Sequence, residues 1–281
     1  MNNTPIRPDQ PFVFSLLENQ AYTSPAPRRP ALFAPLRYLA GIFKIAFSCG
    51  WTARHHHFDN QDAFNRSYDS VKLVEAIGGT VEIRGLEHLA APKGPVVVVA
   101  NHMSLLETFM IPCILIPFRP VCIVLKKELT EYPGFGRAMK ALNHIAVSRD
   151  NPRADFRTVM EEGVAFLNNG ISVILFPQST RNATFIPAEF NTLGVKLAAK
   201  AGVPVVPVAL KTDLHGNGRV CKEFGRIDPS RPVRFRFGPP VDPQKEGRQA
   251  HDRVVRFIAD QLRNWGLPVR ESAAPTGQPT P

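Results

Sequence analysis

The sequence predicts an α/β fold with a mostly parallel central sheet flanked by helices. From about residue 80 onward, short β-rich runs alternate with segments of helical periodicity, which is the pattern of an α/β sandwich. Two of the runs, VVVVA (96–100) and SVILF (172–176), are apolar on both faces. Strands of this kind fit a parallel sheet that is covered by helices on either side.

Seven runs are predicted to be strands, and four segments are predicted to be helices. The strands are expected at 81–84, 96–100, 121–125, 145–147, 171–176, 205–210 and 233–237. The helices are expected near 104–115, 152–167, 190–201 and 247–265. In an open α/β sheet, ligands collect beyond the carboxyl ends of the strands, so the residues that follow each strand are candidates for a functional site.

The chain is expected to form one catalytic domain with appendages, because 281 residues with 44% apolar content can bury a single sizeable core. Residues 1–30 are rich in proline and lack periodicity, and residues 270–281 are mostly small and polar, so both are predicted to be disordered tails. Residues 31–58 are predicted to form a separate helical segment, and residues 59–269 the catalytic domain. The polar first ten residues do not indicate a signal peptide.

The run ALFAPLRYLAGIFKIAFSCGW (31–51) predicts an amphipathic helix that lies on a membrane surface. It is long enough to cross a bilayer, but Arg37 and Lys44 interrupt it. At about 100° per residue, one narrow stripe collects the polar positions Arg37, Gly41, Lys44, Ser48 and His55. Apolar side chains cover the rest of the circumference, which suits a helix in the membrane interface. The alternative is an amphipathic helix packed on its own domain.

The net charge of +10 indicates an anionic partner, which composition alone does not identify. Phospholipid head groups, a phosphorylated substrate, an acidic carrier protein and nucleic acid all fit. Residues 1–58 hold six Lys and Arg against two Asp and Glu. Each basic side chain near an anionic membrane is worth about 1 kcal/mol, so the charge of this segment favours a membrane surface.

The four cysteines Cys49, Cys113, Cys122 and Cys221 show no paired spacing and are interpreted as reduced thiols of a cytosolic protein. They form no metal-like grouping with histidine. The triplet 55–57 is likewise interpreted as a polar helix exit, because no carboxylate or cysteine cluster accompanies it. No metal site is expected.

Polar and basic side chains follow the predicted strands. They are Asn101 and His102 after the second strand, Lys126 and Lys127 after the third, Ser148 and Arg149 after the fourth, and Gln178, Ser179, Thr180 and Arg181 after the fifth. If these strands are parallel, the side chains gather at one edge of the sheet. The sequence therefore predicts a basic pocket that contains an imidazole.

His102 and Glu107 are the candidate acid–base pair. Five positions on a straight helix turn two side chains about 140° apart, so His102 must lie in the turn before the helix. Ser104 is then the expected N-cap, and SLLE (104–107) is a capping-box pattern that folds Glu107 back over the first turn. Glu107 could serve only as a cap, or it could also orient the imidazole and stabilise an imidazolium. The two interpretations are compatible.

Five sequence blocks between residues 96 and 210 occur in a specific order. They are NHMSLLE (101–107), LKKEL (125–129), HIAVSRD (144–150), FPQSTR (176–181) and GVPVVPVAL (202–210). The set resembles the motifs of the glycerolipid acyltransferases, membrane-associated enzymes that include the 1-acylglycerol-3-phosphate acyltransferases. Against the family pattern, Glu107 replaces an aspartate, Gln178 a glutamate and Ser179 a glycine. Arg149 and Arg181 match it.

The resemblance implies acyl transfer from acyl-CoA or acyl-carrier protein to a lysophospholipid hydroxyl, with 1-acylglycerol-3-phosphate as the first expectation for the acceptor. It implies that His102 acts as the base, that Glu107 supports it and that no cofactor is needed. The residues expected to bind substrate are Asn101, Lys126, Lys127, Arg149, Gln178, Ser179, Thr180 and Arg181. A protein of this kind is expected to be peripheral or monotopic on the cytoplasmic face of a membrane, with an anionic membrane surface as its partner.

The sequence leaves some alternatives to this reaction open and disfavours others. A different lysolipid acceptor is open, and the glutamine at 178 leaves room for a non-catalytic, lipid-binding relative. Nucleic acid is not expected as a partner, because the alternating Arg and Phe of RPVRFRF (231–237) fits a strand with one solvated face. A serine hydrolase is disfavoured, because no Gly-x-Ser-x-Gly motif occurs.

Overall fold

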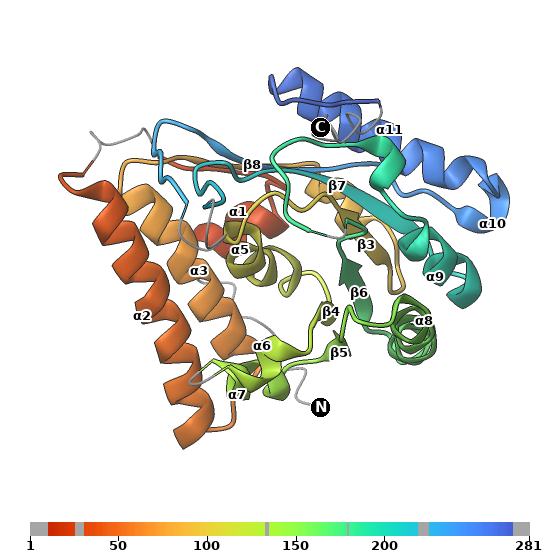
Figure 1. The fold of residues 1–281 in the computed structure, drawn as a ribbon, viewed down its shortest axis with the longest axis horizontal. Coiled ribbons are helices and arrows are strands. Elements are labelled where there is room, and N and C mark those ends of the chain that lie inside the picture. The colour runs from red at the N-terminus through yellow and green to blue at the C-terminus, as the bar shows by residue number, and fades with distance from the viewer. Residues whose placement is uncertain (1–10, 26–30, 133–134, 179, 219–224, 272–281) are drawn as a thin grey trace, which may run out of the picture.

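The computed structural model describes residues 11–25, 31–132, 135–178, 180–218 and 225–271. Within these residues, eight strands form one sheet in the order β1-β2-β8-β7-β3-β6-β4-β5 (Figure 1). The strands are β1 Tyr22–Thr23, β2 Val81–Arg84, β3 Val97–Ala100, β4 Val121–Lys126, β5 His144–Val147, β6 Ser172–Leu175, β7 Val205–Lys211 and β8 Val233–Phe237. Only the β1–β2 and β7–β8 pairs of this sheet are antiparallel. The predicted α/β fold with a mostly parallel sheet is confirmed.

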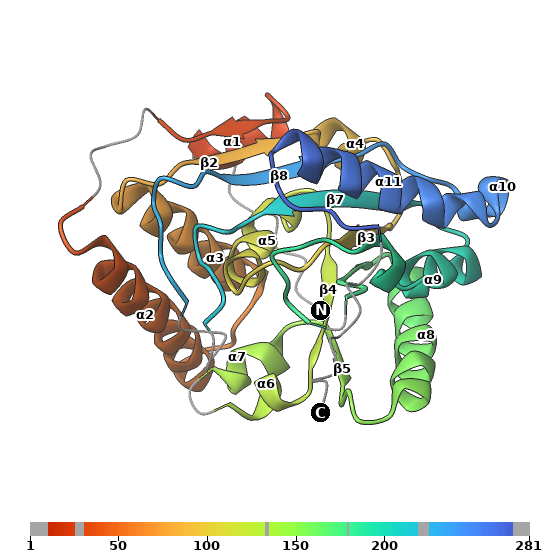
Figure 2. The same ribbon diagram turned by 45° about the horizontal axis from the view of Figure 1, so that its top comes forward.

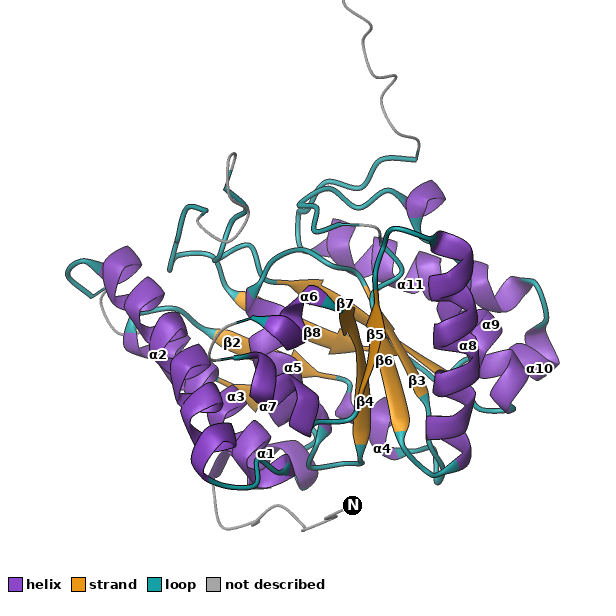
Figure 3. Ribbon diagram, turned by 60° about the horizontal axis from the view of Figure 1, so that its bottom comes forward, coloured by secondary structure: helices purple, strands orange, loops and turns teal. Residues whose placement is uncertain are grey.

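The central strand β3 shows how both faces of the sheet are buried. Val98 and Ala100 belong to a core shared with α3 and α5, while Val97 and Val99 face a second core shared with α8, α9 and α11. Figure 3 shows the strands between these two groups of helices. The helices are α3 Asn60–Ala76, α5 Leu106–Leu115, α8 Pro152–Asn168, α9 Leu193–Ala201 and α11 Gln249–Asn264. The double burial explains the continuous apolar runs in the sequence.

The seven predicted strands and four predicted helices are all present, with ends that differ by a few residues. The helix α3 was missed because its sequence is largely polar. Asp59 and Asp62 form a capping box at its start, since the Asp62 N–H donates to the Asp59 carboxylate at 2.9 Å. The short elements α4 Leu86–Ala90, α6 Glu128–Glu131, α7 Gly136–Ala141, the 3₁₀ helix η1 Pro187–Glu189 and α10 Pro243–Glu246 were not predicted either.

The expectation of a disordered tail over residues 1–30 is wrong for residues 11–25. Helix α1 (Pro11–Leu17) buries Phe12, Val13 and Leu16 in the main core, and β1 pairs with β2. Hydrophobic burial of these three side chains offsets the entropy of ordering the segment. Residues 1–10 and 26–30, and the tail predicted at 272–281, lie outside the described residues.

Helix α2 (Ala34–His55) packs along α3 and against α7 (Figures 1 and 2). Its inner face buries Tyr38, Ile42 and Ile45. Two positions of the predicted polar stripe pack inward, because Gly41 contacts Leu73 and the Ser48 hydroxyl accepts a hydrogen bond from Arg66. Both of these partners belong to α3. The inner face of the helix is therefore packed on its own domain, whereas the prediction of a membrane surface concerns its outer face.

The outer face of α2 carries large exposed apolar side chains. They are Leu36, Phe43, Phe47 and Trp51, which are 58–69% exposed. Arg37 and Lys44 are also exposed and flank this row. Among the described residues, no helix combines the length and the apolar character that crossing a bilayer requires.

Candidate active site

His102 and Glu107 meet at the carboxyl end of β3. His102 lies in the turn before α5, and its Nδ1 is 2.8 Å from Oε1 of Glu107. The carboxylate folds back over the first turn and accepts the backbone N–H groups of Met103 and Ser104 at 2.6 and 3.0 Å. The N-cap position is Leu105, one residue later than predicted, and the Ser104 hydroxyl accepts the Leu106 N–H at 3.1 Å from the residue before it. Glu107 thus caps the helix and holds the imidazole at the same time.

The Glu107 carboxylate is fully buried and is surrounded by donors. Thr212, just after the end of β7, donates its hydroxyl to Oε2 of Glu107. The Ser104 hydroxyl lies 2.9 Å from the Thr212 hydroxyl and completes the set. A buried carboxylate requires such hydrogen bonds, because an unpaired one would be costly. Thr212 was not predicted, although the rule that sites follow strand ends would have found it if applied to β7.

The loop after β6 fixes the position of His102. The Phe176 ring stacks on the imidazole, with 4.5 Å between ring centroids and 28° between their planes. The side-chain oxygen of Gln178 accepts the His102 N–H at 2.6 Å, and the Asn182 N–H donates to the His102 carbonyl at 2.9 Å. Phe176 and Gln178 of the FPQSTR block are therefore brought against His102. Gln178 was expected to bind substrate, but its side-chain oxygen is instead hydrogen-bonded to the backbone of His102.

Asn101 is not placed for the predicted contact with substrate. It is 2% exposed, and its side-chain amide donates to the Leu210 carbonyl at 3.0 Å. Its side-chain oxygen accepts the Leu210 N–H at 2.7 Å. Asn101 therefore joins β3 to β7 beyond their last paired residues, which keeps the His102 turn and the Thr212 turn together.

The predicted cations lie along one edge of the sheet, because β3, β6, β4 and β5 are parallel neighbours in that order. Arg181 precedes Asn182 in the loop that contacts His102. Lys126 forms an ion pair with Glu128 at 2.6 Å, and Lys127 is exposed at the start of α6. Thr180 is exposed, while Ser179 lies outside the described residues.

Of these cations, Arg149 follows the strand that lies farthest from β3 in the sheet order. It follows β5, three strands along from β3, which corresponds to roughly 14 Å between strand ends. Its φ of 69° is left-handed, a conformation that costs about 1–3 kcal/mol for a residue other than glycine. The Asp155 carboxylate supports it by accepting the N–H groups of Ser148 and Arg149 at 2.9 and 2.7 Å. Holding Arg149 in this conformation at the sheet edge therefore costs part of the free energy of folding.

A chain of contacts connects α2 to the site. The Tyr38 hydroxyl lies 3.2 Å from Nδ1 of His215, and the His215 N–H donates to the Thr212 carbonyl at 3.1 Å. Burial raises the pKa of Tyr38, and the negative charge of Glu107 raises it further. Both partners are almost fully buried, so the outer helix is joined to the turn that contacts Glu107.

This arrangement suits proton abstraction beside an anionic group. An imidazole paired with a carboxylate is a general base for a hydroxyl, and an edge rich in arginine binds phosphate. In the part of the chain that the structure describes, no group of three or more His, Cys, Asp or Glu side chains is placed to hold a metal ion.

The sequence is similar to known acyltransferases. Residues 80–211 match the sequence model of a family described as Acyltransferase. The 1-acyl-sn-glycerol-3-phosphate acyltransferase of Pseudomonas aeruginosa is 32% identical over 198 residues, which are 69% of this chain and 73% of the relative. The enzyme of the same name from Cocos nucifera is 31% identical over 186 residues, which are 66% of this chain and 58% of the relative.

The fold also has a solved counterpart. The crystal structure of the 1-acyl-sn-glycerophosphate acyltransferase from Thermotoga maritima superimposes with a TM-score of 0.59 at 22% identity. The match covers 85% of this chain and 97% of that one, so the two share a fold. Together with the relatives from Pseudomonas aeruginosa and Cocos nucifera, this places the chain in the glycerolipid acyltransferase family that includes the 1-acylglycerol-3-phosphate acyltransferases, and makes it an O-acyltransferase.

Proposed function

We propose that the protein transfers a fatty acyl group from acyl-CoA or acyl-carrier protein to the hydroxyl of a lysophospholipid. The proposed acceptor is 1-acylglycerol-3-phosphate, and the product is then phosphatidic acid. The observation that carries the proposal is the 2.8 Å contact between His102 Nδ1 and Glu107 at the carboxyl end of β3. The names of the relatives, which specify 1-acyl-sn-glycerol-3-phosphate, support the choice of acceptor.

In this reaction His102 is the general base. Because Nδ1 faces Glu107, Nε2 is the nitrogen that takes the proton from the acceptor hydroxyl. The oxygen attacks the thioester carbonyl, the C–S bond breaks, and the imidazolium returns the proton to the departing thiolate. Glu107 stabilises the imidazolium between these steps. General-base catalysis of this kind contributes roughly 10²–10⁴-fold to the rate.

The cations along the sheet edge bind the phosphate of the acceptor in this proposal. Arg181 directly precedes Asn182, whose N–H donates to the His102 carbonyl, so this arginine is tied closely to His102. Arg149 is fixed at the far end of the same edge by Asp155. A guanidinium offers two parallel donors to a phosphate, which favours these arginines over Lys126 and Lys127 as the specific contacts.

The outer face of α2 supports membrane association. Phe43, Phe47 and Trp51 expose more than half of their surface on one side of the helix, and Arg37 and Lys44 border them. Such a face inserts into the headgroup boundary, while the cations contact lipid phosphates. We propose a peripheral or monotopic position at an anionic surface on the cytoplasmic side, with α2 between the lipid and the catalytic domain.

The experiment combines a panel of acceptors with two donors. Purified protein is incubated with lysophosphatidic acid, other lysophospholipids and a lysolipid without glycerol, each with acyl-CoA and with acyl-carrier protein, and products are identified by mass spectrometry. Phosphatidic acid is expected as the main product. A preference for another lysophospholipid would replace the proposed acceptor. Lipid binding without turnover across the panel would favour a non-catalytic relative.

A further inference from the structure

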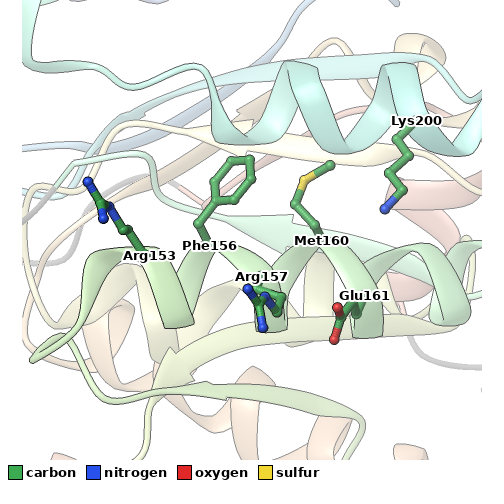
Figure 4. A pocket seen from close by; sticks show the side chains of 6 residues that line it. All are labelled: Arg153, Phe156, Arg157, Met160, Glu161 and Lys200. Carbon is green, nitrogen blue, oxygen red and sulfur yellow. The ribbon is translucent and has the colours of Figure 1, made fainter.

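A groove lies between α8 and α9. These two helices cover the face of the sheet opposite α2 and α3 (Figures 1 and 3). Its volume is about 310 Å³, at the lower end of the range of small-molecule sites. Figure 4 shows the six side chains that line it: Arg153, Phe156, Arg157, Met160, Glu161 and Lys200. Phe156 and Met160 point from α8 toward α9, and Lys200 reaches back toward α8. We refer to this feature as the α8–α9 groove.

The α8–α9 groove combines an apolar wall with cations. Phe156 is 43% exposed, and the Lys196 ammonium lies 5.9 Å from the centre of its ring. Three of the six lining residues are cationic, namely Arg153, Arg157 and Lys200, and one, Glu161, is a carboxylate. An exposed aromatic face can stack on a nucleobase, and neighbouring guanidinium groups bind phosphates through charge-assisted hydrogen bonds. The chemistry of the lining therefore matches a phosphorylated nucleotide.

The position of the groove relates it to His102. Helix α8 begins at Pro152, soon after Arg149, so its Arg153 end opens near the edge of the sheet that carries the active site. The ends of β3 and β5 are roughly 14 Å apart by strand spacing. The pantetheine arm of coenzyme A is equivalent to about five extended residues, or roughly 17 Å. The arm is thus long enough to span from the end of β3 to the end of β5, and Arg153 lies at the start of the helix that follows β5.

We propose that the α8–α9 groove binds the 3′-phosphorylated adenosine diphosphate of acyl-CoA. The adenine stacks on Phe156, and Arg153, Arg157 and Lys200 contact the phosphates. With the outer face of α2 against a membrane, this groove on the opposite face of the sheet is open to water, from which a soluble donor arrives. The inference rests on the proposed acyl transfer and deepens it by naming the donor and its binding residues.

The test compares acyl-CoA with the same acyl group on pantetheine, which lacks the nucleotide. Steady-state rates are measured on the full chain in neutral detergent micelles, so that charge changes do not act through an anionic membrane. The variants are Arg153→Glu/Arg157→Glu and Phe156→Ala. The control Lys245→Glu/Arg248→Glu makes the same change of charge at exposed positions near α10. Thermal unfolding establishes that each variant is folded.

The arginine variant is expected to raise the KM for acyl-CoA about tenfold or more, the effect of losing one or two charge-assisted hydrogen bonds. Phe156→Ala is expected to raise it by roughly tenfold, because stacking of a base on an aromatic ring is worth about 1–3 kcal/mol. Their kcat, and their kinetics with acyl-pantetheine, are expected to match the wild type. Adenosine 3′,5′-bisphosphate should compete with acyl-CoA, and should bind the wild type but not the arginine variant in calorimetry. The control should behave as the wild type throughout.

Equal losses with both donors, or an unchanged KM for acyl-CoA, would overturn the proposal. So would a loss confined to acyl-carrier protein as donor, which would assign the groove to an acidic protein instead. Failure of the proposed acyl transfer is distinguishable, because the wild type would then transfer from no donor. Calorimetry with adenosine 3′,5′-bisphosphate would still decide whether the groove binds a nucleotide.

Discussion

Glu107 and Thr212 lie 105 positions apart in the sequence and share a buried hydrogen bond at the point where β3 and β7 end. The carboxylate thereby has a donor on each side, with His102 on one oxygen and Thr212 on the other. This geometry orients the carboxylate toward the imidazole. The contact joins two distant parts of the chain, so no local sequence motif contains it.

Replacing Thr212 by valine should lower kcat by roughly tenfold, because a hydrogen bond to a charged group is worth about 1.5–3 kcal/mol. Valine keeps the shape of the side chain and removes only the hydroxyl. Thr212→Ser restores the donor and should recover most of the rate. The measurement is kcat for both variants, with urea unfolding to compare stability. Equal activity of the valine and serine variants would mean that the hydroxyl does not position Glu107.

Glu107→Gln should lower kcat by roughly 10²-fold or more, because a neutral amide stabilises the imidazolium far less than a carboxylate. With its amide oxygen at the position of Oε1, glutamine can still accept both the Met103 and the Ser104 N–H groups, so the helix cap is largely kept. The readout is kcat beside the midpoint of thermal unfolding. A variant that unfolds early but keeps its rate would show that Glu107 serves only as a cap.

Phe43→Ser/Phe47→Ser should weaken binding to anionic liposomes roughly tenfold or more, because burying one Phe side chain contributes about 1.5–3 kcal/mol and two no longer insert. The matched control is Phe14→Ser on α1, which removes an aromatic of similar exposure, 55%, from another part of the surface. Binding is measured by liposome sedimentation. Equal losses for the double variant and the control would contradict a docking face on α2.

The buried cysteines should be inert toward alkylating reagents in the folded protein. Burial raises the pKa of Cys49 and of Cys113 to about 12, and raises that of Cys122 as well. At pH 8 the reactive thiolate is therefore scarce at these positions. In a Cys221→Ser variant, which removes the cysteine outside the described residues, iodoacetamide labelling should require unfolding. Rapid labelling of the native variant, detected by mass spectrometry, would contradict this burial.

His251 should make the protein less stable in mild acid. Burial lowers the pKa of His251 below its ordinary value, and its ring lies beside Phe190. Below about pH 6.5 the unfolded chain binds a proton that the folded chain resists, so the free energy of unfolding falls as the pH drops. The fall levels off once the pH passes the lowered pKa. In urea unfolding from pH 7.5 to 5, the free energy of unfolding should decline less steeply for His251→Gln than for the wild type. Identical slopes for the two proteins would mean that another group causes the loss of stability.

The sheet could be predicted from the sequence because its strands are buried on both faces, which leaves continuous apolar runs such as 96–100. The His102 turn could be predicted because the five-residue spacing to Glu107 excludes a regular helix. Helix α1 could not be predicted, because only Phe12, Val13 and Leu16 anchor it in the core and the residues they pack against lie far along the chain. Short segments of this kind have no periodicity to detect.

The contacts within the site depended on strand pairing that no local pattern reveals. Thr212 and Asn101 acquire their partners only because β3 and β7 are neighbours in the sheet. Gln178 was expected at the substrate because of its type and place in the motif, whereas its oxygen holds the His102 backbone. Sequence motifs thus located the site, and the fold determined which of its side chains are taken up in supporting it.

The central claim is that His102 removes the proton from a lysophospholipid hydroxyl. The most direct measurement is the single-turnover rate of acyl transfer to lysophosphatidic acid by wild type and His102→Ala, with liposome binding measured on the same preparations. We predict a loss of roughly 10²–10⁴-fold in rate with unchanged binding, because the face of α2 is separate from the imidazole. A rate for His102→Ala close to that of the wild type would contradict the claim.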